Sequence, residues 1–467
     1  MTTALMTPAQ WAQAQFSSAK LGDRRRTKRL VNIATHLAQS PGGTLPQAFP
    51  QWSDLKAAYR FFNQPKATFE HIQRPHWQST RAACQEPGQY LLIEDTTELD
   101  YTDHPMTEEM GCIGNGRGRG LLLHSTLAMR IEGWDLEERP QAVALGLFYQ
   151  HCWSRWPHPK RKGRETRRQL MSRSRESERW AAALEEGRPP AGSTWIYVAD
   201  RESDFYEPIE RCQRQGGDFV IRGFHDRVLS QGDGRLKEQV AKAPVCGRLS
   251  VEVRARAGRA ARTAQVEVRA LAVSLNGPRR SEGKRPDFSI NVVEVREAGT
   301  PAGVQPLHGL LLTSLPCDTW THVRRIIGVY TMRWCVEEYH KALKSGAGAE
   351  DSQMERAYRI ESLVAVLGVV AVRLFNTKWL ARTRPNEPVN PKIFGPQLLA
   401  LLAAKFGKPD GGWTHGATLV AVARVGGFLA RKSDGMPGWQ TIWRGWNRLI
   451  WMYHGLEILK NEHERSG

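Results

Sequence analysis

The sequence contains no long hydrophobic run, no cysteine framework and no N-terminal signal. Its longest apolar run, residues 363–372 (LVAVLGVVAV), stops at Arg373 and falls well short of the ~20 residues that a membrane-spanning helix needs. The chain does not open with a charged start followed by an apolar stretch, so no secretory signal is expected. Its 7 cysteines are scattered and lack CxxC spacing, which argues against a disulfide framework and a zinc site. These absences favour a cytoplasmic protein with no membrane partner.

Negative charge is scarce as well. Lys plus Arg number 66 against 48 for Asp plus Glu, so the net charge is +18 and the pI about 9.8. This excess favours a polyanionic partner, with nucleic acid ahead of an anionic membrane surface. The densest basic run in the central part of the chain is residues 158–168 (HPKRKGRETRR). It is interpreted as a DNA-facing loop, with a merely solubilising loop as the alternative.

Glycine is concentrated in residues 111–120 (GCIGNGRGRG). A phosphate-cradling loop would lie between a strand and a helix, and this stretch does not. It is interpreted as a flexible hairpin tip, with Arg117 and Arg119 available to phosphates.

Two acidic side chains follow short apolar runs that are typical of buried strands. Residues 90–93 precede Glu94 and Asp95, and residues 195–199 precede Asp200. An acid at a strand end usually forms a turn or caps a helix. Together with a third acid, Glu337, the two form a set that could converge on folding.

Such a set would need cations. Like charges about 4 Å apart repel by about 4 kcal/mol at an effective dielectric near 20. Hard divalent cations prefer oxygen ligands, and two of them would clamp a phosphodiester for in-line displacement.

The third acid lies in residues 330–344 (YTMRWCVEEYHKALK). Read as one helix, this stretch places five polar residues on one face, because they recur every three or four positions: Tyr330, Arg333, Glu337, Lys341 and Lys344. Trp334, Val336, Tyr339 and Leu343 fall elsewhere and can supply packing. A solvated charged face is the alternative interpretation.

The order Asp95, Asp200, Glu337, with the last inside Y-x2-R-x3-E-x6-K, resembles the DDE signature of bacterial cut-and-paste transposases of the insertion-sequence-four group. Matching segments run through nearly the whole chain, among them SSAKLGDRRRTKRLVN near the start, AYRF at 58–61, IEDTTELDY at 93–101, VADRESD at 198–204 and ARVGGFLARKSDGMPGW at 423–439. The resemblance implies an α/β fold with a ribonuclease-H-like core. It also implies two Mg2+ ions per active site on the three acids, with Mn2+ as a substitute.

The resemblance further implies partners and a location. Double-stranded DNA, as terminal inverted repeats and as target, would be bound by a homodimer associated with the bacterial nucleoid in the cytoplasm. The ends would be nicked, released through a hairpin, reopened and joined to target DNA. The alternatives are a DNA-binding repressor that has lost catalysis and a ribonuclease-H-like nuclease acting on ordinary DNA or RNA.

Several DNA-contacting residues carry over from the family. Tyr330, Arg333, Lys341 and Lys344 would hold phosphates, and Arg222 matches another contact. In the N-terminal region the carried-over residues are Arg25, Arg26 and Arg29, for which a solvated basic face is the alternative, and Tyr59 and Arg60, which match the family's AYRF segment. The family's base-stacking tryptophan aligns with Gly309, so the stacking residue is unassigned; the neighbouring His308 could replace it or could be structural.

Three regions are expected. Residues 1–70 form a helical domain that binds transposon ends, and a helix there starts at Thr7-Pro8 and runs to Phe16. Residues 71–380 form the core, in the order helix, three strands, helix, strand, helix, strand up to residue 225, with the first strand ending at Asp95. An antiparallel β subdomain is inserted at 226–305, where residues 249–256, 264–274 and 288–297 alternate apolar with charged residues and are expected to be strands.

The third region, residues 381–467, is expected to be a helical dimerisation domain. An aromatic stripe there packs either within the chain or against a second copy: Trp439, Trp443, Trp446, Ile450 and Tyr453.

Overall fold

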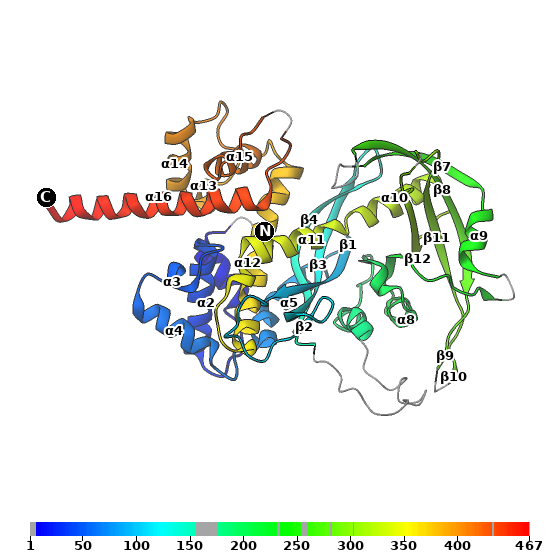
Figure 1. Ribbon diagram of the computed structural model, residues 1–467, viewed down its shortest axis with the longest axis horizontal. Coiled ribbons are helices and arrows are strands. Elements are labelled where there is room, and N and C mark those ends of the chain that lie inside the picture. Colours follow the sequence, from blue (N-terminus) through cyan, green and yellow to red (C-terminus); the bar gives the residue numbers. More distant parts are fainter. Residues whose placement is uncertain are drawn as a thin grey trace.

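The structure is a computed structural model that describes residues 6–155, 176–230, 234–253, 260–280, 283–301, 303–431 and 434–466. It is a mixed α/β fold in which helices at both ends of the chain flank one large sheet (Figure 1). The basic run at 158–168 lies outside the described residues.

The N-terminal region is helical. Its helices are α1 (Pro8–Phe16), α2 (Arg24–Gln39), α3 (Leu45–Ala48) and α4 (Trp52–Phe62), followed by α5 (Phe69–Ala83). The start of α1 is confirmed, because Thr7 caps it in a capping box with Gln10. Helix α2 is capped by Asp23, whose carboxylate accepts from the Arg25 N–H at 2.8 Å. It buries residues at helical spacing, including Leu30, Ile33 and Leu37.

The sheet contains ten strands. They are β1 (Gln89–Asp100), β2 (Gly111–Ile113), β3 (Gly118–Trp134), β4 (Pro140–Trp153), β5 (Thr194–Ala199), β6 (Asp218–Arg222), β7 (Val245–Val253), β8 (Arg262–Leu275), β11 (Phe288–Glu297) and β12 (His308–Thr313). Their order is β2-β3-β1-β5-β6-β12-β11-β8-β7, and β4 pairs with β3. Strand β1 is parallel to β5 and antiparallel to β3, and β5 is parallel to β6. The expected order of elements up to residue 225 is confirmed, with β2 as an additional strand.

The glycine-rich stretch is a hairpin, as expected, because β2 and β3 pair across it. Arg117 at its tip is exposed. Arg119 is not free, since its Nη2 donates to the His104 carbonyl at 2.9 Å.

The antiparallel strands expected in the 226–305 segment are present within the described residues as β7, β8 and β11. Strands β7, β8 and β11 pair antiparallel with one another, and β11 pairs with β12, which pairs with β6. The segment therefore extends the core sheet from its β6 edge. A two-stranded ribbon, β9 (Arg279–Arg280) with β10 (Gly283–Lys284), projects from it.

The expected single helix over residues 330–344 is wrong. Helix α10 (Trp320–Thr331) ends before Arg333, α11 (Trp334–Lys341) follows, and a π-helical turn, η5 (Ala342–Gly346), comes next. Four backbone N–H groups between Met332 and Val336 donate to carbonyls three residues back. These tighter turns rotate the residues that follow out of the phase of a continuous α-helix.

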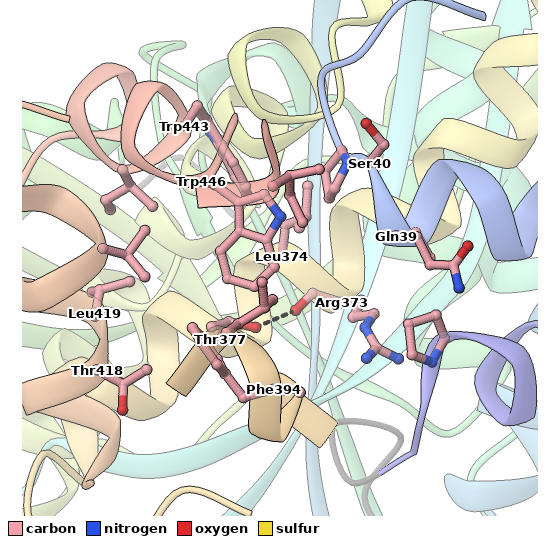
Figure 2. Close-up of a pocket in the computed structure, with 18 of the residues that line it drawn as sticks. Gln39, Ser40, Arg373, Leu374, Thr377, Phe394, Thr418, Leu419, Trp443 and Trp446 are labelled. Atoms are coloured by element: carbon pink, nitrogen blue, oxygen red, sulfur yellow. Dashed lines mark hydrogen bonds between the residues drawn. The ribbon is translucent and has the colours of Figure 1, made fainter. Parts of the chain in front are cut away.

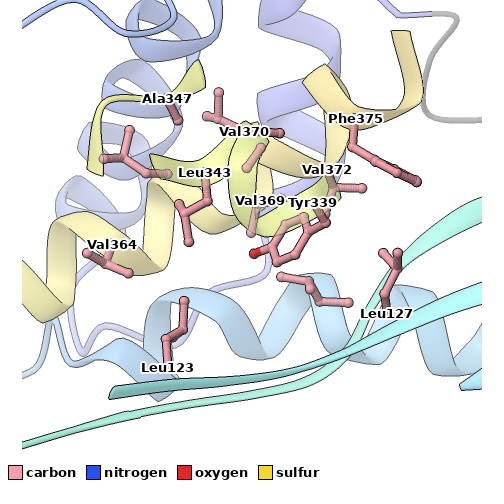
Figure 3. Close-up of a cluster of buried hydrophobic side chains, with 14 of the residues drawn as sticks. Leu123, Leu127, Tyr339, Leu343, Ala347, Val364, Val369, Val370, Val372 and Phe375 are labelled. Atoms are coloured by element: carbon pink, nitrogen blue, oxygen red, sulfur yellow. The ribbon is translucent and has the colours of Figure 1, made fainter. Parts of the chain in front are cut away.

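The long apolar helix α12 (Ala357–Thr383) runs through the centre of the molecule. At 27 residues it is long and apolar enough to cross a membrane by length and composition, but 83% of its most apolar window is buried inside the fold. Figure 3 shows Val364, Val369 and Val370 of this helix in one buried cluster with Tyr339, Leu343 and the strand residue Leu123. It is therefore a core helix, as the run at 363–372 suggested.

The C-terminal region contains α13 (Pro391–Phe394), α14 (Pro396–Phe406), α15 (His415–Val425) and the long α16 (Trp439–Ser466). The first part of the aromatic stripe packs within the chain, because Trp439 and Trp443 are buried and stack on each other at 5.5 Å. The far part of α16 extends away from the other helices (Figure 1). There Trp451, Met452 and Leu456 are exposed.

Candidate active site

Asp95 and Asp200 lie side by side on neighbouring strands. Ile93 of β1 is in register with Val198 of β5, so two residues further along each parallel strand lead to the two aspartates. Asp200 directly follows β5, as expected, and its carboxylate caps the next turn by accepting from the Glu202 N–H at 2.7 Å. Asp95 does not end its strand, because pairing with β3 continues β1 to Asp100.

Glu337 reaches the two aspartates from α11. It lies in the first turn of that helix, and a single guanidinium connects it to β1. Arg333 donates from Nη2 to Glu337 Oε1, and its Nη1 is 3.8 Å from Asp95 Oδ2. All three side chains are largely but not completely buried. The fold thus brings Asp95 beside Asp200 and connects Asp95 to Glu337 through Arg333, although these acids are far apart in the sequence.

The pKa values of Asp95 and Arg333 reflect the charged groups around them. The pKa of Asp95 is raised to about 7, chiefly by burial and then by the charge of Asp200, while the charge of Arg333 opposes the shift and that of Glu337 adds a smaller contribution. Burial opposes the charge of Arg333, but the hydrogen bond and charge of Glu337, with smaller contributions from Tyr330 and Asp95, together outweigh it and raise the pKa of the guanidinium. The site therefore holds more negative charge than one arginine neutralises.

The donor set fits a hard divalent cation by its chemistry, since it consists of carboxylate oxygens. With the side chains as they stand, no group of three or more His, Cys, Asp or Glu among the described residues could hold a metal ion. Two of the three acids are instead connected by Arg333, whose guanidinium pairs with Glu337 and lies 3.8 Å from Asp95.

The two lysines of the expected stripe turn away from the acids. Lys341 Nζ is 3.0 Å from Glu338 Oε1 and 4.3 Å from the centre of the Trp334 ring. Lys344 Nζ is 3.2 Å from Glu350 Oε1. The expectation of one continuous face is therefore corrected, because the tight turns at Arg333 and the π turn at Ala342–Gly346 change the phase. Trp334, expected to pack, is 41% exposed.

Tyr330 and Arg222 lie together at the edge of the site. Burial raises the pKa of Tyr330, and a hydrogen bond with Arg222 opposes this. Arg222 Nη2 also donates to the His308 carbonyl at 3.3 Å. The His308 ring is held by Glu294 Oε1 at 2.9 Å, and space is open around Gly309. The stacking residue therefore stays unassigned.

A buried polar network that the sequence reading missed lies beneath the site. Gln150 Nε2 donates to Ser125 Oγ and to the Tyr339 hydroxyl, each at 2.8 Å. His340 Nε2 is 3.1 Å from Ser125 Oγ. Because Tyr339 and His340 follow Glu337 on α11, these bonds fix that helix against β3 and β4. The signal was present in LLLHSTLAM, where three polar residues interrupt an otherwise apolar strand.

Glu338, which the sequence reading also passed over, joins three helices. Its carboxylate accepts from Lys378 of α12 at 2.8 Å and from the indole N–H of Trp439 of α16 at 2.9 Å. Lys341 of its own helix donates at 3.0 Å. Burial disfavours the charge, but hydrogen bonds from Lys378 and Lys341 outweigh it and lower the pKa of Glu338 to about 2.

This carboxylate makes stability depend on pH. Because the folded-state pKa lies below the ordinary value of 4.5, the stabilisation is present above that value and is lost as pH falls toward 2. We expect Glu338→Gln to cost about 2 kcal/mol of unfolding free energy at pH 7, allowing for screening, and much less at pH 3. Denaturant unfolding at both pH values measures this. The exposed Glu355 provides the control, and an equal loss in Glu355→Gln would contradict the assignment.

The N-terminal candidates lie on helices α2 and α4. Arg25 pairs with Asp23 at 2.9 Å while its side chain is 91% exposed. Arg26 donates to the Leu21 carbonyl and Arg29 to Asp54. Tyr59 and Arg60 are exposed.

These helices also carry the match to known proteins. Residues 8–67 match the family model described as transposase DNA-binding. The matched segment covers α1 to α4 and includes all five N-terminal candidates. The chain thus carries an N-terminal transposase DNA-binding domain, which makes DNA its partner and supports a transposase.

Proposed function

We propose that the protein is a DDE transposase that binds transposon ends, cleaves them and joins their 3′ ends to target DNA. The observation that carries the proposal is that Asp95 lies beside Asp200 and is connected through Arg333 to Glu337. A repressor would need the DNA-binding domain but not a buried acidic cluster. A general ribonuclease-H-like nuclease would need the cluster but not the transposase DNA-binding domain.

The sheet order supports a ribonuclease-H-like core. Five strands, in the order β4-β3-β1-β5-β6, consist of three antiparallel strands followed by two parallel ones. In that fold the first and fourth strands in sequence are neighbours, as β1 and β5 are here. This adjacency accounts for the meeting of Asp95 and Asp200.

The proposed mechanism uses the three acids and the guanidinium of Arg333. Bound at Asp95, Asp200 and Glu337, a pair of Mg2+ ions would activate water or a DNA 3′ hydroxyl and stabilise the leaving oxygen. Before DNA binds, Arg333 pairs with Glu337 and lies close to Asp95. Its planar guanidinium also suits bidentate binding of a phosphate. When DNA arrives, Arg333 can exchange a carboxylate for a backbone phosphate. Tyr330 and Arg222 lie next to it and can hold the adjoining phosphate.

The proposal also includes a hairpin intermediate and a homodimer. Cleavage would pass through a DNA hairpin, as the resemblance implies. A homodimer would form through α16, and the exposed Trp451, Met452 and Leu456 on its far part support this.

The N-terminal domain provides a prediction about DNA binding. Arg25 is almost fully exposed, so we expect Arg25→Ala to weaken binding of end DNA several-fold and to reduce the salt dependence by about one counterion. Fluorescence anisotropy at several salt concentrations measures both quantities. Lys237→Ala removes the same charge from α9 (Leu236–Lys242), on the other side of the molecule (Figure 1). An equal loss in that control would mean that only net charge matters.

One experiment separates the three functions. The purified protein is incubated with a pre-cut candidate end, Mg2+ and a supercoiled target plasmid. A transposase joins the end to the plasmid, a repressor binds the end without joining it, and a nuclease degrades DNA without joining. Absence of joined product with every end tested, under conditions where the end is bound, would refute the proposal.

A further inference from the structure

A cavity of about 500 Å³ lies where the N-terminal helices, α12 and the C-terminal helices meet. Figure 2 shows Gln39 at the end of α2, Leu374 and Thr377 of α12, and Leu419 and Trp446 of the C-terminal helices around it. None of the three acids Asp95, Asp200 and Glu337 lines this cavity. Its size is typical of sites for small organic molecules.

The wall of the cavity is apolar and carries positive charge only. Among the described residues that line it, none is an aspartate or a glutamate, whereas Arg373 and Lys378 are present. Lys378 is already paired with Glu338 at 2.8 Å. Arg373 is different, because its Nη1 is buried without a hydrogen-bond partner and its guanidinium lies 5.7 Å from the Trp11 ring centre.

Burying the Arg373 guanidinium without a negatively charged partner costs free energy. Burial lowers the pKa of Arg373 to about 10, and a buried cation is normally paired with an anion. Three further donors of the same wall, the Thr418 hydroxyl and the indole N–H groups of Trp443 and Trp446, are also buried without partners. Buried polar groups are nearly always hydrogen-bonded. These buried donors therefore lack hydrogen-bond partners, and no carboxylate among the described lining residues neutralises Arg373.

We propose that this cavity binds a small amphipathic anion, a carboxylate on an alkyl or aryl body. Its acidic group pairs with Arg373, and its apolar body lies among Leu374, Leu419 and Trp446. A ligand held there contacts the DNA-binding helices, the core helix and the C-terminal helices together, so it stabilises their junction.

Two fluorescent probes test this directly. Anilinonaphthalene sulfonate carries an anionic group, and phenylnaphthylamine has the same aromatic body without it. We expect the full-length protein to bind the anionic probe about tenfold more tightly, and Arg373→Met to remove that preference while changing the neutral probe less than about twofold. Arg373→Lys should retain part of it. Dodecanoate and 2-naphthoate as competitors distinguish an alkyl from an aryl acid.

Two control variants make the result specific. Arg382→Met removes an exposed arginine from the same helix and should leave binding of both probes unchanged. Thr377→Trp places a large side chain at the exposed rim and should block both probes. Equal affinity for the two probes, or equal effects of Arg373→Met and Arg382→Met, would overturn the proposal. If Arg373→Met does not fold, the two probes on the wild-type and Thr377→Trp proteins still decide it.

Discussion

Replacing Asp200 with alanine is expected to reduce end cleavage and strand transfer by about a thousandfold or more, while binding of end DNA is unchanged. The carboxylate lies beside Asp95 on the neighbouring strand and belongs to the set of three acids. The DNA-binding helices α1 to α4 lie in a different part of the chain. Single-turnover cleavage on denaturing gels and a gel-shift assay measure the two quantities.

Asp200 also caps a turn, so a second variant separates the two roles. Asp200→Asn keeps a side-chain oxygen for the Glu202 N–H and therefore keeps the cap, but it removes the negative charge. We expect activity to be lost in both variants and thermal stability to fall only in Asp200→Ala, by about 1 kcal/mol. Substantial cleavage by a folded Asp200→Asn protein would mean that the carboxylate does not act in the reaction.

Replacing Gly445 with alanine is expected to cost about 3 kcal/mol of stability in the C-terminal region. Helices α15 and α16 cross here with their backbones in contact. A Cβ added at Gly445 would lie 1.8 Å from the Val422 carbonyl oxygen, and one at Gly426 would lie 1.9 Å from that of Thr441. These obstacles are backbone atoms, so the helices themselves must separate.

The same helix provides a control of opposite sign. A Cβ at Gly455, also on α16, meets nothing within 4 Å, so Gly455→Ala should gain about 1 kcal/mol from helix propensity. Thermal unfolding and limited proteolysis of the C-terminal helices compare the two variants. If both shift stability in the same direction, the close crossing is not what requires glycine at position 445.

The candidate site was predictable in its members but not in its arrangement. The acids were found because short apolar runs precede Asp95 and Asp200 and because helical spacing marks Glu337. The helical spacing then misplaced Lys341 and Lys344. Periodicity assumes an unbroken helix, and the hydrogen bonds of Met332 to Val336 break it. Those bonds depend on the packing of α10 and α11 against the sheet, which no local pattern records.

In the fold too, local patterns predicted the strands but not their pairing. The strands of the 226–305 segment were recognised from alternating apolar and charged residues, because alternation is a local property of a half-buried strand. Their attachment to the core sheet through β12 and β6 joins residues distant in the sequence, and alternation gives no information about partners. The length of β1 was underestimated for a similar reason, since its polar second half is held by pairing with β3.

The sequence by itself determined the positive charge and predicted the helical ends and the three acids, because each follows from composition or local spacing. Only the tertiary structure decided that Arg333 bridges Asp95 and Glu337, that Glu338 ties α11 to α12 and α16, and that Arg373 faces a cavity without a counter-ion. The physical reason is that each of these contacts joins side chains that packing alone brings together or orients. Their energies depend on burial, which a linear pattern does not contain.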